Sequence, residues 1–106
     1  CCRIGKNTRI QSHSFLCSKV SIGNDCFIGH GVMFVNDLFK FGGPAVNEAD
    51  ILTTQIGDNV SIGTGSSILP VNIVNGTVIG AGSVVTKNLT VKGIYAGNPA
   101  KLIRKL

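Results

Sequence analysis

The sequence is poor in charged residues, and acidic residues are the scarcer kind. Asp, Glu, Lys and Arg make up 14% of the 106 residues, and ten Lys and Arg against five Asp and Glu give a net charge of +5. An ordinary domain carries roughly 25% charged residues. So few charges on a chain of this size indicate that part of its surface is covered by another molecule or subunit.

Tryptophan, long apolar runs and a leader pattern are also missing. Without tryptophan and with a single tyrosine, the sequence lacks the stacking residues that accompany a basic stripe in nucleic-acid binders. No apolar run is long enough to cross a bilayer, and residues 1–16 lack the charged and apolar regions of a secretory signal. Because 43% of the residues are hydrophobic, intrinsic disorder is excluded. These features predict a soluble, cytoplasmic protein with a single domain, residues 1–106.

The four cysteines, Cys1, Cys2, Cys17 and Cys26, are expected to be reduced thiols, because no secretory signal accompanies them and aliphatic residues suffice for a core. No activating neighbour is evident for Cys17 or Cys26, which argues against a cysteine nucleophile. The chain has no Met at position 1 and opens on a complete repeat. We therefore expect a fragment or a processed chain.

The most prominent feature is a six-residue period. It breaks after residue 34, resumes at residue 56 and contains one five-residue step. Ile, Leu, Val and Phe make up about a third of the chain, yet they fill every position of this register, so chance does not explain it. The positions are Ile4, Ile10, Leu16, Ile22, Ile28, Phe34, Ile56, Ile62, Ile68, Ile73, Ile79, Val85 and Val91.

Mostly small or β-branched residues form a second register, four positions after the first. This period fits neither an amphipathic helix nor an alternating strand. It is typical of short parallel strands joined by tight corners, with one large and one smaller side chain pointing inward. The fold class is therefore all-β, a parallel β-helix. The second register comprises Thr8, Ser14, Val20, Cys26, Val32, Leu38, Val60, Ser66, Thr77, Ser83 and Leu89.

Three hexads per coil predict about four coils, over residues 4–39 and 56–96, with an external loop at 40–55 and a short C-terminal tail at 97–106. A single helical turn is expected over residues 100–106. A loop of 16 residues in a small domain is more often functional than idle. The loop is therefore a candidate part of the site.

Three segments resemble the hexapeptide-repeat acyltransferases: residues 22–31 (IGNDCFIGHG), 79–87 (IGAGSVVTK) and 95–101 (YAGNPAK). The hexads indicate the fold, whereas the ending GNPAK is more specific for coenzyme A-dependent members. The resemblance implies a left-handed β-helix, an exception to the usual right-handed crossover. It also implies a homotrimer with acetyl-coenzyme A (acetyl-CoA) as cosubstrate and no metal. Members of the family begin several hexads earlier, so N-terminal coils are expected to be missing here.

Residues 29–39 (GHGVMFVNDLF) and the loop segment 42–45 (GGPA) are most similar to the N-acetyltransferases of nucleotide-linked 3-amino sugars, above all of dTDP-3-amino-3,6-dideoxyhexoses. Galactoside and maltose acetyltransferases instead carry a catalytic His just after the segment that matches residues 34–36, where this chain has Leu38 and Phe39. The resemblance predicts acetyl transfer to the amine of a nucleotide-linked amino sugar. The alternatives are O-acetylation of a sugar or small molecule, or a non-catalytic β-helix fragment.

His13 and His30 are the side chains that titrate near neutral pH without special tuning. Both fall on the second face of adjacent coils, so they are expected about one strand spacing, roughly 5 Å, apart. His30, in the family-like segment just before the loop, is the candidate catalytic proton acceptor. His13 is a candidate substrate-binding residue. A corner histidine that only faces solvent is the alternative for each.

Asn36 and Asp37 stand where the coil gives way to the loop and are candidate catalytic and substrate-binding residues. The carboxylate would hold the sugar amine or its hydroxyls, and the amide would fix a hydroxyl or orient the thioester. The alternative is a simple Asn-Asp turn that begins the loop.

The pantetheine arm of the cofactor is expected along corners made of small residues, with late basic residues on its phosphates. An ordinary basic tail is the alternative for any single lysine. The candidate cofactor-binding residues are Gly63, Gly80, Ala81, Gly82, Lys87, Ala96, Lys101 and Arg104.

Three other β-helix functions fit less well. A γ-class carbonic anhydrase needs three His ligands for zinc, more than His13 and His30 supply. An ice-binding β-helix would show regular Thr arrays on one flat face, and a scaffold gives no reason for the long loop.

Overall fold

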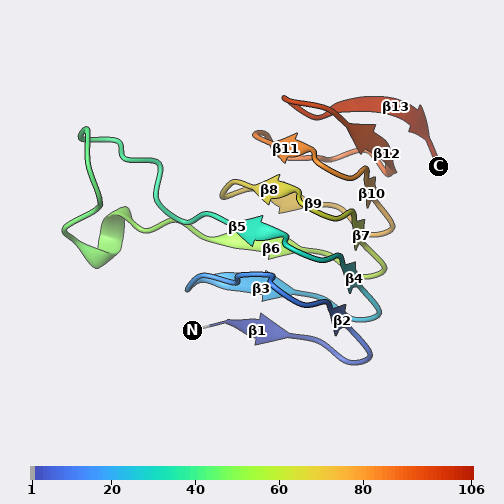
Figure 1. The fold of residues 1–106 in the computed structure, drawn as a ribbon, viewed down its shortest axis with the longest axis horizontal. Helices are drawn as coiled ribbons and strands as arrows, with labels where there is room; N and C mark the ends of the chain where they lie inside the picture. The colour runs from blue at the N-terminus through green and yellow to red at the C-terminus, as the bar shows by residue number, and fades with distance from the viewer. Residues whose placement is uncertain (1) are drawn as a thin grey trace.

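A computed structural model describes residues 2–106 as a column of short strands (Figure 1). Within these residues the helical content is one 3₁₀ turn, η1 (Glu48–Asp50). The strands are β1 (Arg3–Ile4), β2 (Arg9–Ile10), β3 (Val20–Ile22), β4 (Phe27–Ile28), β5 (Met33–Phe34), β6 (Thr54–Ile56), β7 (Ser61–Ile62), β8 (Ser67–Ile68), β9 (Asn72–Ile73), β10 (Val78–Ile79), β11 (Val84–Val85), β12 (Gly93–Ala96) and β13 (Lys101–Lys105).

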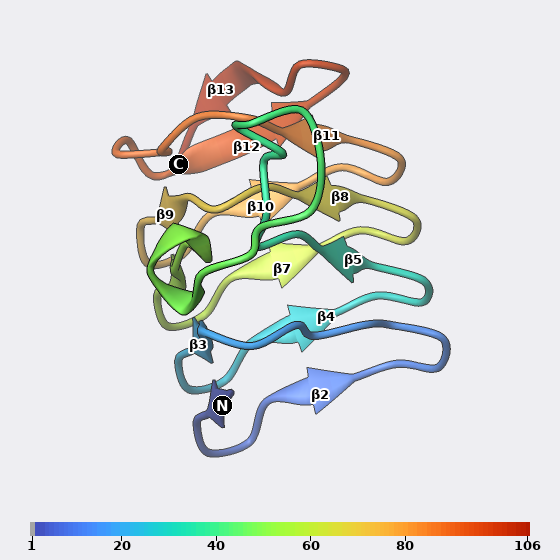
Figure 2. The same ribbon diagram turned by 90° about the vertical axis from the view of Figure 1, so that its left-hand side faces the viewer.

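The strands form three sheets that run along the column. The first has the order β1-β3-β6-β9, the second β13-β12-β10-β7-β4-β2 and the third β11-β8-β5. Successive coils pair in parallel, and β12 pairs with β13 antiparallel. In Figure 1 the chain climbs from the N-terminus, runs along the back through β3, comes forward through β4 and returns along the front through β5. Figure 2 confirms this order from the side, and the turn is left-handed. The fold is a left-handed parallel β-helix.

Most positions of the six-residue register form the core, but Ile4, in the first coil, is 50% exposed. Ile10, Ile28, Ile62 and Ile79 lie directly above one another, and Tyr95 completes the column. The side chains of Ile28 and Ile62 are fully buried. Burial of one such side chain contributes about 1.5–3 kcal/mol, so stacked columns of this kind supply most of the stability of the coils.

Side-chain caps close the corners between the first and second sheets. Asn24 Oδ1 accepts a hydrogen bond from the Lys6 N–H (2.7 Å), and Asp58 Oδ1 accepts one from the Asn24 N–H (2.8 Å). Asn75 Oδ1 accepts from the Asp58 N–H in the same way (2.7 Å). Asn and Asp therefore recur at these corners because each one caps the backbone of the coil below.

Inward hydroxyl groups link successive coils. Ser66 Oγ donates to the Gly80 carbonyl oxygen (3.1 Å) and accepts from the Ser83 N–H (3.3 Å). Thr54 and Thr77 are equally buried, but the Oγ1 atom of each has no hydrogen-bond partner within residues 2–106. An unpaired hydroxyl in the core lowers stability.

Replacing Thr77 with valine is expected to raise the free energy of unfolding by about 1 kcal/mol, because valine keeps the shape of the side chain and removes the unpaired hydroxyl. Ser66→Ala, which removes a linking hydroxyl, is expected to lower it by about 1 kcal/mol. Urea denaturation of the two variants beside the wild type measures both changes. A Thr77→Val variant that is less stable than the wild type would contradict the prediction.

The six-residue period does not continue through the last coil. Val91, predicted in the core, is 42% exposed, and Leu89 is buried in its place against Ile73. Tyr95 then fills the column above Ile79, and its hydroxyl donates to the Val91 carbonyl oxygen (2.6 Å). The prediction for Val91 was wrong because the step after Val85 is four residues instead of six, so that Leu89 lies above Ile73.

The C-terminal tail is a strand, so the predicted helical turn over residues 100–106 was wrong. In β13, Lys101 lies opposite Ala96 of β12, and Arg104 lies opposite Ile94. The open edge of β12 offers unpaired backbone groups, which favour a further strand over a helix.

Two further predictions concern the loop boundary and the membrane. Leu38 and Phe39, which the period assigned to the second coil, are exposed and lie in the loop. The described part of the chain contains no helix with the length and hydropathy of a membrane span.

Cys2, Cys17 and Cys26 are free thiols, and Cys1 lies outside the described residues.

Candidate functional site

His30 lies at the corner between the second and third sheets, where four coils stack in register. Glycines hold this stack together. The Gly31 N–H donates to the Ser12 carbonyl oxygen (3.0 Å), and the Gly65 N–H donates to the His30 carbonyl oxygen (2.8 Å). The corresponding bond from Gly82 to Thr64 (2.8 Å) continues the stack. We call this stack the corner column, formed by Ser12, His30, Thr64 and Ala81.

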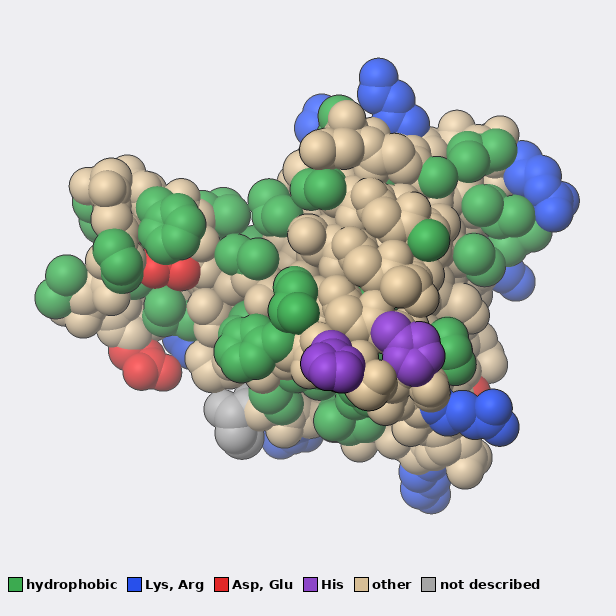
Figure 3. Space-filling model, viewed as in Figure 1, with side chains coloured by type: hydrophobic (Ala, Val, Ile, Leu, Met, Phe, Trp, Pro, Cys, Tyr) green, Lys and Arg blue, Asp and Glu red, His purple; other side chains and the backbone are tan. Residues whose placement is uncertain are grey.

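The imidazole of His30 is exposed and is held at one nitrogen. Nδ1 lies 3.0 Å from Ser12 Oγ, whereas Nε2 makes no hydrogen bond within residues 2–106. His13 follows Ser12 and has a φ of 63°, in the place that Gly31 takes one coil higher. Figure 3 shows both imidazoles on the same face of the molecule. The structure thus brings the two candidate histidines together.

In the part of the chain that the structure describes, backbone N–H groups of the corner column lack the side-chain caps found at the corner between the first and second sheets. At the first corner, side chains of the next coil cap the N–H groups of Lys6, Asn24 and Asp58. The equivalent N–H groups of His30 and Thr64, and those of Ser12 and Ala81, make no hydrogen bond to any described residue. A row of free N–H groups beside an imidazole suits an extended ligand that carries carbonyl oxygens.

The small residues predicted to bind a cofactor lie at this same corner. A Cβ added at Gly63 would lie 2.5 Å from Ala81 N, and one added at Gly80 would lie 3.1 Å from Ala96 Cβ. Stacking of the coils therefore requires glycine at position 63 and leaves little room at position 80. Gly82 has a φ of 69° and open space around its Cα. Ala81 and Gly82 are exposed, so they are the residues that a ligand can reach.

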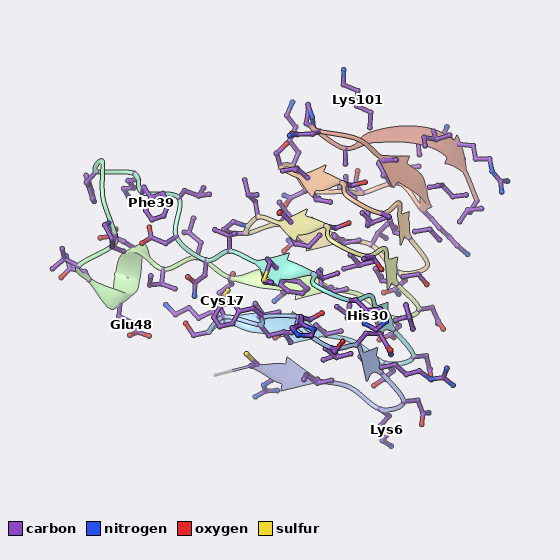
Figure 4. The ribbon with its side chains drawn as sticks, viewed as in Figure 1. Lys6, Cys17, His30, Phe39, Glu48 and Lys101 are labelled. Carbon is purple, nitrogen blue, oxygen red and sulfur yellow. The ribbon has the colours of Figure 1, made fainter. Side chains whose placement is uncertain are left out.

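The three basic candidates do not form one cluster. Lys101 is opposite Ala96, at the upper end of the corner, and its side chain points away from the ribbon in Figure 4. Arg104 lies farther along β13, opposite Ile94. Lys87 comes two residues after β11, whereas the corner column lies before β11. The structure places only Lys101 beside the small residues of the corner.

Asn36 and Asp37 lie away from His30. Five residues separate Asn36 from His30, and Phe39, two residues after Asp37, lies on the loop at the left of Figure 4, whereas His30 lies on the right. Asn36 Nδ2 donates to the carbonyl and hydroxyl oxygens of Ser18, both at 3.0 Å. Asp37 accepts from the N–H groups of Phe39 (3.0 Å) and Ala45 (2.6 Å). These bonds match the simple turn that begins the loop, and within one chain they leave both side chains far from the imidazole.

The loop projects from the column on the side opposite His30 (Figure 4). Lys19 fixes it, because Lys19 Nζ donates to the carbonyl oxygens of Glu48 (3.0 Å) and Ile51 (3.2 Å) and lies 3.9 Å from the Glu48 carboxylate. The loop nonetheless leaves apolar side chains exposed. They are Leu38, Phe39, Phe41, Val46 and Leu52.

Replacing Lys19 with methionine is expected to speed proteolytic cleavage of the loop by roughly tenfold, because a hydrogen bond from a charged donor contributes about 1.5–3 kcal/mol. Limited proteolysis at low protease concentration measures the rate. Lys6→Met is the matched control, because the side chain of Lys6 is exposed and makes no hydrogen bond within the described residues. Equal cleavage of both variants would show that Lys19 does not hold the loop.

Neither cysteine thiols nor a metal cluster supplies an alternative site. Burial raises the pKa of the Cys17 and Cys26 thiols, so less of the nucleophilic thiolate forms. Within residues 2–106 no group of three or more His, Cys, Asp or Glu side chains is arranged to hold a metal ion.

Residue types in the sequence did not predict that Ser12 and Thr64 belong to the corner column or that Lys19 holds the loop. The 18-residue coil length was the available signal for Ser12, since it places Ser12 beneath His30. No sequence signal marks Lys19, because its partners are backbone carbonyls of the loop.

Two family matches cover both halves of the β-helix. Residues 1–36 match the family described as bacterial transferase hexapeptide (six repeats), and residues 53–87 match the hexapeptide repeat of succinyl-transferase. Most of the loop and the C-terminal tail lie outside both.

Among relatives, a protein of Schizosaccharomyces pombe with a provisional acetyltransferase name is 40% identical over 90 residues, covering 82% of this chain and 44% of its own length. Among solved structures, the polySia-specific acetyltransferase NeuO is 31% identical with a TM-score of 0.82, over 98% of this chain and 51% of that one. A maltose O-acetyltransferase of Clostridium difficile is 28% identical with a TM-score of 0.84, over 99% and 59%. This chain thus spans about half the length of each of these three proteins.

Proposed function

Since this chain belongs to the hexapeptide-repeat transferase family, we propose that it is an acetyltransferase that takes its acetyl group from acetyl-CoA. The observation that carries the proposal is the corner column, where the exposed His30 imidazole adjoins a row of free backbone N–H groups. The imidazole suits proton transfer and the donors suit the amide and thioester carbonyls of the cofactor.

In the reaction, a neutral amine attacks the thioester carbonyl carbon and forms a tetrahedral intermediate. His30 Nε2 takes the proton that the amine loses as the C–N bond forms. The C–S bond then breaks, and the proton passes to the departing sulfur, so that the N-acetyl product and free coenzyme A leave His30 neutral. A backbone N–H beside the imidazole stabilises the negative charge on the carbonyl oxygen.

For the cofactor, the proposal places pantetheine along Ala81 and Gly82 and the phosphates near Lys101. Charge supports this direction, because residues 59–106 contain five Lys and Arg and no acidic residue. Arg104 and Lys87 lie farther away and would reach only the outer phosphates.

For the acceptor, we propose the amine of a nucleotide-linked amino sugar, which the similarity of residues 29–39 favours. O-acetylation of a sugar is the second candidate, favoured by the likeness to the maltose O-acetyltransferase. Leu38 and Phe39 replace the histidine expected of the maltose enzymes, so the shared fold does not carry over their mechanism. Both cosubstrates are cytoplasmic metabolites, and we place the protein there.

The partner is proposed to be two further copies of this chain, in a homotrimer. Lys19 and Asp37 hold the loop away from the His30 of its own chain. The loop can therefore complete a site only at the corner of a neighbouring copy. The exposed apolar residues of the loop, with Phe41 at 76% and Val46 at 95%, provide the surface for such a contact.

An acceptor panel tests the proposed reaction. The chain is incubated with acetyl-CoA and, in turn, a dTDP-linked 3-amino sugar, a UDP-linked amino sugar and maltose, and mass spectrometry detects the acetylated product. Acetylation of the amino sugars alone is the expected result. Acetylation of maltose alone would favour the O-acetyltransferase, and no product from any acceptor, with acetyl-CoA bound, would remove the proposed acceptor class.

A further inference from the structure

We propose that Ser12 is a positioning residue that fixes the tautomer of His30, an inference that rests on the proposed function. Ser12 lies one coil below His30, and its Oγ is 3.0 Å from His30 Nδ1. Within residues 2–106 this hydroxyl has no other hydrogen-bond partner, so the imidazole is the group that it serves.

The backbone holds both partners at a fixed height. The Gln11 N–H donates to the Ile28 carbonyl oxygen (2.9 Å) just before Ser12, and the Gly31 N–H donates to the carbonyl oxygen of Ser12 itself (3.0 Å). These two backbone hydrogen bonds between neighbouring coils hold Ser12 below His30, so the hydroxyl reaches Nδ1 without a movement of the backbone.

Ser12 is exposed and contributes nothing to the core, so packing does not explain its contact with the imidazole. The next residue, His13, takes the left-handed corner position. Because His13 occupies that position, the hydroxyl of Ser12 is the group directly beneath the ring.

The direction of the hydrogen bond decides what His30 can do. When the Ser12 oxygen accepts the Nδ1 proton, the lone pair lies on Nε2, the nitrogen that makes no hydrogen bond within residues 2–106. Nε2 then takes the proton from the attacking amine, and the imidazolium keeps its Nδ1–H bond to Ser12 until Nε2 returns that proton to the coenzyme A sulfur. The opposite direction would leave Nε2 already protonated and unable to act as the base.

Nitrogen NMR of the ¹⁵N-histidine-labelled chain tests the tautomer without any substrate. We expect a protonated Nδ1 and an unprotonated Nε2 for His30 in the wild type and in Ser12→Thr, which keeps the hydroxyl. In Ser12→Ala the Nε2–H form is expected to gain population. Ser21→Ala, an outward serine of β3 with no side-chain hydrogen bond within the described residues, is the matched control and leaves the His30 resonances unchanged.

The kinetic part of the test uses the best acceptor of the panel. We expect Ser12→Ala to lower kcat about three- to tenfold at unchanged KM for acetyl-CoA, the effect of losing one such hydrogen bond, with recovery in Ser12→Thr. A His30 tautomer that is Nε2–H in the wild type, or one that Ser12→Ala does not alter, would overturn the inference. A changed tautomer with unchanged kcat would overturn it too. A wild-type chain that transfers no acetyl group would instead remove the proposed function, and the spectra would still report whether Ser12 sets the tautomer.

Discussion

Replacing His30 with alanine is expected to lower kcat for acetyl transfer by about 10²- to 10⁴-fold, the usual contribution of a positioned general base. The imidazole is exposed at the corner column, and its Nε2 makes no hydrogen bond within residues 2–106. The substitution removes the proposed proton acceptor and leaves the aliphatic core intact. Steady-state kinetics of the variant with the best acceptor of the panel measures the loss.

Two further measurements on His30→Ala distinguish a loss of catalysis from a loss of structure. The melting temperature and the affinity for acetyl-CoA are expected to stay at wild-type values, because the only hydrogen bond of the His30 side chain within residues 2–106 is its contact with Ser12. Lys6→Ala, at the other corner, is the control and retains wild-type kcat. Wild-type turnover by His30→Ala, with normal acetyl-CoA binding, would show that another group accepts the proton.

Replacing Gly63 with alanine is expected to lower the free energy of unfolding by about 3 kcal/mol, at the upper end of the usual cost of overpacking. The new Cβ would lie 2.5 Å from Ala81 N and 2.8 Å from Ala81 Cα. Both are backbone atoms of the next coil, so relief requires the coils to separate and weakens the ladder bond from the Gly63 N–H to the Ile79 carbonyl oxygen (2.8 Å). Urea denaturation measures the change.

Gly43→Ala is the matched control for this substitution. A Cβ there meets no atom within 4 Å, and the residue does not have a left-handed φ. Its stability is expected within about 0.5 kcal/mol of the wild type, as for most surface changes. Equal stability of the two variants would mean that the coils can separate at the corner at no cost.

The six-residue period predicted the fold because each aliphatic residue meets its equivalent in the next coil. The stacking of Ile28, Ile62 and Ile79 could be predicted without knowing which residues contact each other, because the repeat puts equivalent residues in register. The period failed where the repeat ends. The burial of Leu89 in place of Val91 depends on how the last coil closes, and the open edge of β12 decides that the tail is a strand. Both depend on tertiary contacts that no single hexad contains.

The candidate site was predictable only in part, for a similar reason. The hexad register placed His30 at a corner beside the coil of His13, and the structure has both there. Residue type alone did not predict that the polar atoms of Asn36 and Asp37 would bond to the chain itself, because their partners, Ser18 and Ala45, are chosen by the path of the loop. Loop paths follow from packing and hydrogen bonds that a local sequence pattern does not specify.

Calorimetric titration with acetyl-CoA, on a sample whose molar mass in solution is determined by light scattering, tests the proposed function most directly. The corner column and Lys101, which are proposed to hold the cofactor, are both present in this chain. We expect saturable binding with a Kd on the order of micromolar, about −8 kcal/mol, with one acetyl-CoA per chain in a trimer. A folded trimer that binds no acetyl-CoA would contradict the proposal and leave a β-helix without a transferase site.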